Sequence, residues 1–198
     1  MNATQPIRCK HQVSQYINYY RQHGQLRNYV LTVICVHTAL RISDILALSY
    51  EDVYDASNRP RQSISITEKK TGKAKIIALH KNIVSALGLY RRTATPGAPL
   101  ILNSQTGKSI TRVHAYRILR AAAEALGFTH NVSCHSLRKT LGYHAWKGGT
   151  SPAVIMEIYN HSSLHITRRY LGVNQDDMNL VYLGLDYLRS KSGKSDES

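Results

Sequence analysis

The sequence predicts a mainly helical domain with a small antiparallel β-sheet at one side. Apolar residues recur at the three- and four-residue spacing of helices along most of the chain, whereas strand-like alternation is confined to residues 63–79. The length of 198 residues suffices for one domain with a real core and leaves no comfortable room for a second. We therefore expect a single domain over residues 1–198, with its core at about 10–173.

Two helices are predicted near the start of the chain. Residues 12–23 have a weak helical pattern that ends at Gly24. Residues 27–38 are more apolar, so we expect a helix that is mostly buried against its neighbours. This second helix would deliver Arg41 to the surface.

A short helix is expected next, with Ser43 as its hydroxyl cap. Asp44 is predicted to lie near Arg41 and to be exposed enough to pair with it. Taken alone, such a pair would more often be a surface ion pair of little energetic value.

A β-hairpin with a basic tip follows. Residues 63–67 alternate with period two, residues 75–79 form a second apolar strand, and the turn at residues 69–73 joins them. Without further motifs, this lysine-rich turn would be interpreted as a solvated loop.

Residues 82–92 are predicted to form a helix, and residues 99–103 a brief extended segment. The clearest helix spans residues 111–126 and ends at Gly127. It has a basic side and an apolar side, formed by Arg112, His114, Arg117 and Arg120 and by Val113, Tyr116, Leu119 and Ala123. The basic side could contact DNA phosphates. An ordinary surface helix explains the same pattern equally well.

Residues 132–172 concentrate side chains that are suited to phosphate chemistry. His135 and Arg138 are three residues apart, so on a helix they share one face and are expected to point outward together. His161 and Tyr170 follow, nine residues apart. By spacing alone, each of these residues more often serves as a cap, a core group or a surface charge.

Further helices are predicted in the C-terminal part of the chain. The two glycines at 148–149 would end the helix that carries His135, and residues 150–152 offer a hydroxyl cap and a first-turn proline for the next. Residues 175–189 form a last helix, whose apolar stripe consists of Met178, Val181, Tyr182, Leu185 and Leu188. The stripe needs a covering surface, which the domain's own core could provide. Residues 190–198 are polar and expected to be disordered.

The charge balance favours a polyanionic partner. The chain has 26 Lys plus Arg against 12 Asp plus Glu, a formal net charge of +14. Between Ala56 and Met156 the only acidic residues are Glu68 and Glu124. Nucleic acid is therefore the leading candidate, and a merely basic soluble domain is the alternative.

Cysteine usage and the apolar runs point to a reduced, cytoplasmic protein. Cys9, Cys35 and Cys134 are odd in number and lack metal-ligand spacing, so neither a disulfide framework nor a zinc site is indicated. The longest apolar run, residues 29–36, is too short to cross a bilayer, and residues 1–10 lack the apolar core of a signal peptide.

Several short motifs stand in a recognisable order. The chain reads His-x-Leu-Arg-x-Thr from His135, Asn-His-Ser-Ser-Leu from Asn160 and Thr-Arg-Arg-Tyr from Thr167. About a hundred residues upstream, residues 38–45 read Thr-Ala-Leu-Arg-Ile-Ser-Asp-Ile. In this order the motifs resemble the two signatures of the tyrosine recombinase (phage integrase) family, whose catalytic domain residues 27–173 would cover. The chain is similar to the short recombinases that invert fimbrial promoter segments.

The resemblance implies a site-specific DNA recombinase that cuts and rejoins strands through a 3′-phosphotyrosyl intermediate. Tyr170 would be the nucleophile, and Arg41 and Arg138 would clamp the phosphoryl oxygens with their planar guanidinium groups. Because no acidic cluster has metal-binding spacing, the arginines would take the place of metal ions. The reaction is expected to need no metal, no ATP and no other cofactor.

The remaining roles are also implied by the resemblance. His135 would accept a proton or donate to the phosphate, and His161 would be a second donor. Asp44 would orient the first arginine and the histidines. A hairpin lysine would protonate the leaving 5′-oxygen, and the residue that resembles it best is Lys70, with Lys69, Lys73 and Lys75 still possible.

Double-stranded DNA and further copies of the chain are the expected partners. The residues expected to contact DNA are all basic: Lys69, Lys73, Arg112, Arg117, Arg120, Lys139, Arg168 and Arg169. Members of the family often pass their C-terminal helix to the next protomer, so a homo-oligomer of two to four copies through residues 175–189 is the rival to docking on the same chain. The resemblance also implies a bacterial protein, encoded by a plasmid or a phage.

The sequence departs from the family pattern at a few positions. Ala39 stands where the family usually has Gly, Asp44 where Glu is commoner, and Lys139 where a second His often occurs. Tyr159 and Asn160 replace a usual Leu-Gly pair. None of these changes removes a group that would touch the phosphate.

Two other functions remain open from the sequence. A catalytically idle DNA-binding or directionality factor could keep the fold, and topoisomerase-like relaxation would use the same chemistry. No separate N-terminal helical domain is expected, since about twenty-five residues precede the catalytic part. The chain would therefore be a minimal recombinase or a fragment of a longer integrase.

Overall fold

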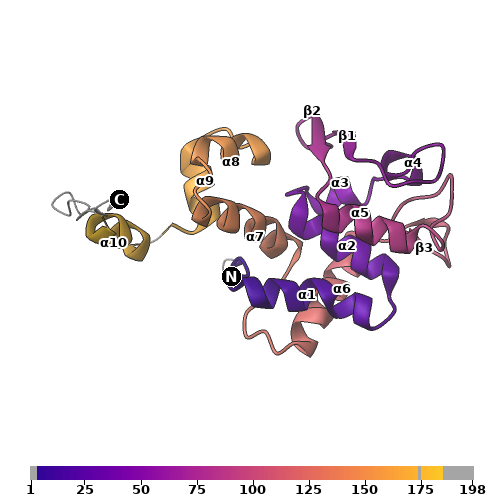
Figure 1. Cartoon of the computed structure of the whole chain (residues 1–198), viewed down its shortest axis with the longest axis horizontal. Coiled ribbons are helices and arrows are strands. Elements are labelled where there is room, and N and C mark those ends of the chain that lie inside the picture. Colours follow the sequence, from indigo (N-terminus) through magenta and orange to yellow (C-terminus); the bar gives the residue numbers. More distant parts are fainter. Residues whose placement is uncertain (1–3, 174, 185–198) are drawn as a thin grey trace, which may run out of the picture.

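The computed structural model describes residues 4–173 and 175–184 of the chain. Within them the fold is mainly helical with a small antiparallel sheet, as the sequence predicts, and the last helix lies beyond one end of the body (Figure 1). In this part of the chain no helix is both long enough and apolar enough to cross a membrane.

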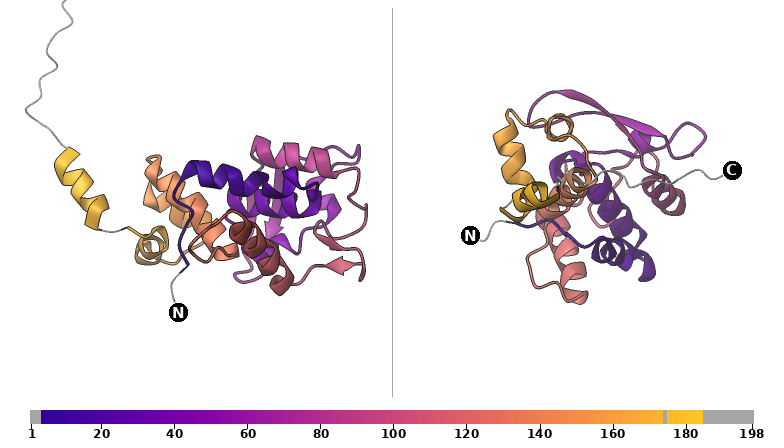
Figure 2. Two further views of the ribbon diagram at one scale, coloured as in Figure 1. Left: turned by 90° about the horizontal axis from the view of Figure 1, so that it is seen from below. Right: turned by 60° about the vertical axis from the view of Figure 1, so that its left-hand side comes forward.

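The body is built around α2 (Leu26–His37), which is buried from Asn28 to Val36 because almost all of these side chains are apolar. Helices α1 (Lys10–Gln22) and α5 (Lys81–Tyr90) pack on α2, and α6 (Arg112–Ala125) packs on α1 (Figure 2). All four helices were predicted, with bounds that differ by one or two residues.

The packed side of α6 differs from the prediction. Val113 was expected on the apolar side but is 60% exposed. Ala115, Ile118 and Ala122 are buried together with the predicted Leu119. The packed face of α6 therefore includes several small alanines and lies away from Val113.

The predicted hairpin is present. Strand β1 (Ser63–Thr67) pairs antiparallel with β2 (Ala74–Ala78), with Ser63 opposite Ala78. A second, smaller ladder joins β3 (Leu102–Asn103) to β4 (Lys108–Ser109). Strand β4 was not predicted, because two residues are too few to show a periodicity.

Two single-turn helices lie between α2 and the hairpin: α3 (Ile42–Ile45) and α4 (Tyr50–Val53). The prediction that Ser43 caps the first of them is wrong, since α3 begins directly after Arg41 and has no side-chain cap. The hydroxyl cap belongs to α4, where Ser49 forms a capping box with Asp52.

The C-terminal part folds as the start and stop signals predict. Helix α7 (Cys134–Lys147) ends at Gly148, and α8 (Pro152–Tyr159) starts behind the Ser151 hydroxyl with proline in its first turn. Helix α9 (Leu164–Leu171) then folds back on α7 and α8.

Helix α10 (Gln175–Gly184) projects away from the body in both figures. An ion pair between Lys147 and Asp177 links its first turn to the end of α7. Val181 and Tyr182 of the predicted stripe are 59% and 76% exposed, and their neighbour Leu183 is 85% exposed. Among the described residues these side chains do not dock on the core. The predicted residues 185–189 and the tail 190–198 lie outside the described residues.

Two hydrophobic clusters meet between α2 and α3. The larger includes Leu40 and fills the space among α1, α2, α5 and α6, and the smaller includes Ala39, Tyr159 and Leu171. Ala39 has a φ of 54°, a left-handed conformation that suits the glycine usual in the family and strains an alanine. The strained backbone of Ala39 thus lies at the point where the two hydrophobic clusters meet.

Candidate active site

Arg41 pairs with Glu68 and not with Asp44, which corrects the prediction. Its Nη1 lies 2.7 Å from Glu68 Oε2, and the Glu68 side chain is fully buried while that of Arg41 stays 21% exposed. The partial exposure leaves part of the guanidinium accessible to a ligand.

Asp44 is buried, with 4% exposure, and was predicted to be exposed. Its Oδ1 accepts a hydrogen bond from the backbone N–H of Lys69 at 3.1 Å. Asp44 therefore anchors the basic turn of the hairpin. The helix α3 is a single turn, so residue spacing alone could not show on which side its acid would lie.

Arg138 is buried, with 3% exposure, so the prediction that it points outward with His135 is wrong. His135 remains exposed. The guanidinium of Arg138 donates to the carbonyl oxygens of Ala39 and, at 3.0 Å, of Tyr159, and it lies over the Tyr159 ring at 4.9 Å. Carbonyls from two separate segments thus hold Arg138 in one orientation.

Tyr159 is the scaffold for Arg138. Its hydroxyl accepts from the Gly142 N–H at 2.8 Å and donates to the Arg138 carbonyl at 2.6 Å. A Cβ at Gly142 would overlap the Tyr159 ring, so α7 needs a glycine at this point of closest approach. The family's usual leucine could make none of these hydrogen bonds.

Arg41 and Arg138 line the same hollow, which has a volume of about 450 Å³. His135, Lys69, Lys70 and Arg112 line it as well. The predicted clamp requires both arginines at one site, and a shared hollow is consistent with that prediction.

Tyr170 lies beside the predicted histidines. Its ring centroid is 5.7 Å from that of His135 and 5.1 Å from that of His161. Burial raises the pKa of Tyr170, while the charges of Arg138 and Arg41 lower it. Among the described residues its buried hydroxyl makes no hydrogen bond of normal distance and angle.

The surroundings of both histidines favour the neutral imidazole. Burial, followed by the charges of Arg138 and Arg41, lowers the pKa of His161 to about 4. Burial and the same arginines, together with Lys139 and Lys70, also lower the pKa of His135. Neutral imidazole can accept a proton, which suits the role predicted for His135. The Nδ1 of His161 lies 3.0 Å from Thr167 Oγ1, which fixes the ring.

The free energy of unfolding of the DNA-free protein should fall as the pH is lowered from about 6.5 towards about 4. The pKa of His161 is about 4 when folded and near its usual 6.5 when unfolded, so in this window the unfolded chain binds more protons. The contribution of neutral His161 to the free energy of unfolding is therefore complete above about pH 6.5 and lost below about pH 4. Urea unfolding at several pH values measures the slope, which should be shallower in His161→Gln; an equal slope would contradict the assignment.

The hairpin lysines differ in position. Lys69 and Lys70 line the hollow. Lys73 is exposed, and the half-buried Lys75 donates from Nζ to the Ile158 carbonyl. Burial lowers the pKa of Lys75. The position of Lys70 suits the role predicted for it, and Lys75 is held against α8.

The basic residues predicted to contact DNA are spread over several surfaces. Lys139 donates to the Thr4 carbonyl at 2.8 Å, and its Nζ lies 5.2 Å from the Tyr170 ring centroid. Arg117 lines a separate depression with Tyr20 and Asn103. Arg168 is exposed, and the Arg169 side chain lies outside the described residues.

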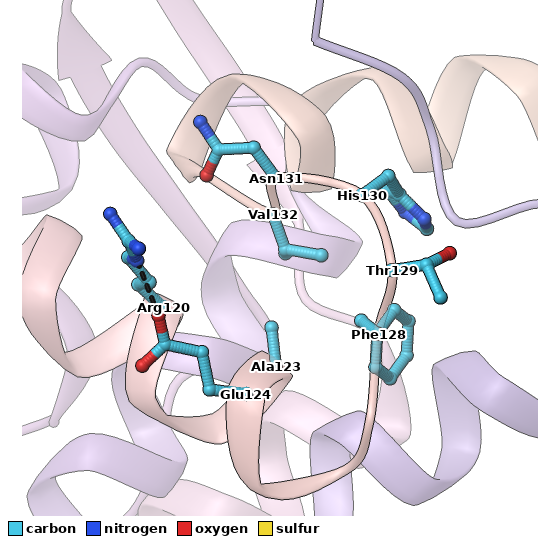
Figure 3. A pocket seen from close by; sticks show the side chains of 8 residues that line it. All are labelled: Arg120, Ala123, Glu124, Phe128, Thr129, His130, Asn131 and Val132. Atoms are coloured by element: carbon cyan, nitrogen blue, oxygen red, sulfur yellow. Dashed lines mark hydrogen bonds and ion pairs between the residues drawn. The ribbon is translucent and has the colours of Figure 1, made fainter.

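Arg120 also lies apart from the arginine hollow. It pairs with Glu124 at 2.6 Å, and both line a hollow of about 330 Å³ between the end of α6 and the following loop (Figure 3). The six residues predicted to be catalytic do not line this second hollow.

Residue spacing missed Glu68, Tyr159 and Thr167 as parts of the site. Glu68 did carry a signal, because it is one of two acids in a long basic stretch. Tyr159 and Thr167 lie inside or next to the quoted motifs, but nothing in the sequence shows that they support Arg138 and His161.

The geometry can now be compared with known proteins. A profile of the phage integrase family matches residues 9–177. The chain belongs to the phage integrase family. The match includes every residue that was predicted to be catalytic.

Two curated relatives of this integrase-family chain match most of their own length. The probable integrase/recombinase YoeC of Bacillus subtilis is 35% identical over 182 residues, which are 92% of this chain and 97% of YoeC. The type 1 fimbriae regulatory protein FimE of Escherichia coli is 28% identical over 153 residues, 75% of each chain. The chain spans about half the length of several longer curated relatives.

A solved structure confirms the fold class. The XerH site-specific recombinase, bound to a palindromic difH substrate in a post-cleavage complex, superposes with a TM-score of 0.70 at 18% identity. The match covers 91% of this chain and 53% of XerH. The named integrases and recombinases among the relatives support site-specific DNA recombination as the class of activity and do not favour an idle binding factor.

Proposed function

We propose that this integrase-family chain cuts and rejoins DNA at a specific site through a 3′-phosphotyrosyl intermediate. The observation that carries the proposal is the hollow shared by Arg41, Arg138 and His135, with the Tyr170 ring packed beside His135. Planar guanidinium groups match phosphoryl oxygens bidentately, and two of them can stabilise the charge that develops there.

The proposed step exchanges one ester bond for another. The Tyr170 oxygen forms a bond to phosphorus, and the bond from phosphorus to the 5′-oxygen breaks. The phenolic proton passes to neutral His135, and Lys70 supplies a proton to the leaving 5′-oxygen. The phosphotyrosyl ester conserves the free energy of the broken phosphodiester bond. The strands can therefore be rejoined without ATP.

Double-stranded DNA is the proposed substrate. The net charge of +14 and the basic lining of the hollow support it, as does the difH substrate bound to XerH. Lys69, Arg112 and Lys139 are the proposed phosphate contacts nearest the site, because the first two line the hollow and the third lies over the Tyr170 ring.

We expect binding to weaken steeply as salt concentration rises, because each neutralised phosphate releases counterions. The logarithm of the affinity should fall linearly with the logarithm of the salt concentration. Replacing Arg112 by Ala should make this slope shallower by about one. Fluorescence anisotropy with a labelled duplex measures it, and a flat response would contradict contact with phosphates.

The chain is also proposed to act as an oligomer on DNA through α10. Val181 and Tyr182 of the predicted stripe, and their neighbour Leu183, support this, because they stay exposed in the part of the chain that the structure describes. A second copy of the chain is the proposed surface for this stripe.

The test is incubation with a nicked suicide duplex in EDTA, without nucleotide. The proposal predicts a covalent protein–DNA adduct and a released strand with a free 5′-hydroxyl. No adduct on a duplex that the protein demonstrably protects would favour the idle DNA-binding factor. Relaxation of supercoiled DNA by the protein as a monomer would favour the topoisomerase-like alternative.

A further inference from the structure

Glu68 is a fully buried acid at the base of the hairpin turn. Its Oε2 atom accepts three side-chain hydrogen bonds: from Arg41 Nη1 at 2.7 Å, from Thr71 Oγ1 at 2.9 Å and from Asn160 Nδ2 at 2.9 Å. The donors come from three segments that are distant in sequence, so one oxygen joins the start of α3, the hairpin turn and the end of α8.

Each donor is a proposed catalytic residue or its neighbour. Arg41 is one arm of the clamp, Thr71 follows Lys70, and Asn160 precedes His161. A small displacement of Glu68 would therefore move three parts of the site together.

The buried charge of Glu68 is compensated at Oε2 alone, because Oε1 is buried and makes no hydrogen bond among the described residues. An isolated buried carboxylate is costly, whereas one that is paired and hydrogen-bonded is tolerated. Burial raises the pKa of Glu68, but the hydrogen bonds from Asn160, Arg41 and Thr71 outweigh this and lower the pKa to about 2. Glu68 is thus ionised under all ordinary conditions.

We propose that Glu68 is a positioning residue for strand cleavage, holding Arg41, the Lys70 turn and the segment of His161 in register through one carboxylate oxygen. This inference rests on the proposed function. Glu68 acts through its three donors and is not expected to touch the phosphate.

Asn160 makes the inference specific to this chain. It has a φ of 54°, the left-handed conformation in which glycine is favoured, and it stands where the family usually has glycine. Glycine at this position would have no side-chain amide to donate a hydrogen bond to Glu68. The variant Asn160→Gly therefore removes one hydrogen bond from Glu68 without straining the backbone.

Strand cleavage should slow in Glu68→Gln while DNA binding does not weaken. Gln is nearly isosteric but lacks the charge that holds Arg41, and a misplaced catalytic group costs about tenfold to a hundredfold in rate. Single-turnover cleavage of the nicked duplex and anisotropy measure the two quantities. Thermal unfolding shows whether each variant is folded. Wild-type cleavage by a folded Glu68→Gln would overturn the inference while leaving the proposed function intact.

Asn160→Gly tests the same idea at a position that cannot misfold for backbone reasons. Its cleavage should be several-fold slower than wild type, and the loss should be clearly smaller when Glu68 is already Gln. Equal losses in both backgrounds would show that Asn160 acts independently of Glu68.

The matched control is Glu51→Gln, which makes the same substitution on α4. Glu51 accepts a hydrogen bond from the Gly97 N–H at 2.7 Å but lies outside the site, so this variant should cleave like wild type. A second readout does not need activity: in the DNA-free protein, Asn160→Gly should shift the backbone NMR signals of Lys70 and Thr71, and Glu51→Gln should not. Unshifted signals would overturn the inference even if the wild type formed no adduct.

Discussion

Replacing Tyr170 by Phe should abolish the covalent protein–DNA adduct. Phe keeps the ring that packs against His135 and His161 and removes only the attacking oxygen. Loss of a nucleophile commonly costs more than about a thousandfold in rate, while DNA affinity should remain within a few-fold of wild type. The measurement is a denaturing gel of the nicked-duplex reaction.

Tyr143→Phe is the matched control for this experiment. Tyr143 lies on α7, and the Cζ atom of Arg8 lies 5.5 Å from the centroid of the Tyr143 ring. Tyr143 has no proposed part in cleavage. It should form the adduct at the wild-type rate. If the adduct persisted in Tyr170→Phe and disappeared in Tyr143→Phe, the nucleophile would be Tyr143 and not Tyr170.

Arg138→Lys should reduce cleavage by at least about a hundredfold and leave DNA binding nearly unchanged. The guanidinium donates to the carbonyls of Ala39 and Tyr159 at once, and Arg138 also lines the hollow. An ammonium is a point charge and cannot span these partners. Cleavage rate and affinity should be measured on the same duplex.

The control for Arg138→Lys is Arg59→Lys. Arg59 is exposed, pairs with Asp55 at 3.1 Å and does not line the hollow that holds Arg41 and Arg138. This variant should change neither quantity. If Arg138→Lys reduced DNA binding and cleavage equally, Arg138 would act in binding. The proposal that it stabilises the phosphoryl oxygens during cleavage would then be contradicted.

The elements of this fold were largely predictable because their signals are local. Helix starts and stops at Gly148, Ser151 and Pro152 depend on neighbouring residues, and the structure has them where they were predicted. The ladder of β3 and β4 was missed in part, since it is too short to carry a pattern.

The partners within the site were less predictable, because they depend on contacts between distant segments. Asp44 is three residues from Arg41, yet the arginine pairs with Glu68, 27 residues away. The three-residue spacing of His135 and Arg138 predicted a shared face correctly. It could not show that Tyr159, from another helix, covers Arg138 and leaves His135 exposed.

The central claim is that six side chains meet around one phosphate: Arg41, Lys70, His135, Arg138, His161 and Tyr170. A crystal structure of the protein with cleaved duplex DNA and vanadate, which adopts the geometry of a phosphoryl group in transfer, tests it most directly. We expect the Tyr170 oxygen in line with the 5′-oxygen and both guanidinium groups within hydrogen-bonding distance of the equatorial oxygens. A vanadate centre contacted by only one of the two arginines, or approached by a different tyrosine, would contradict the claim.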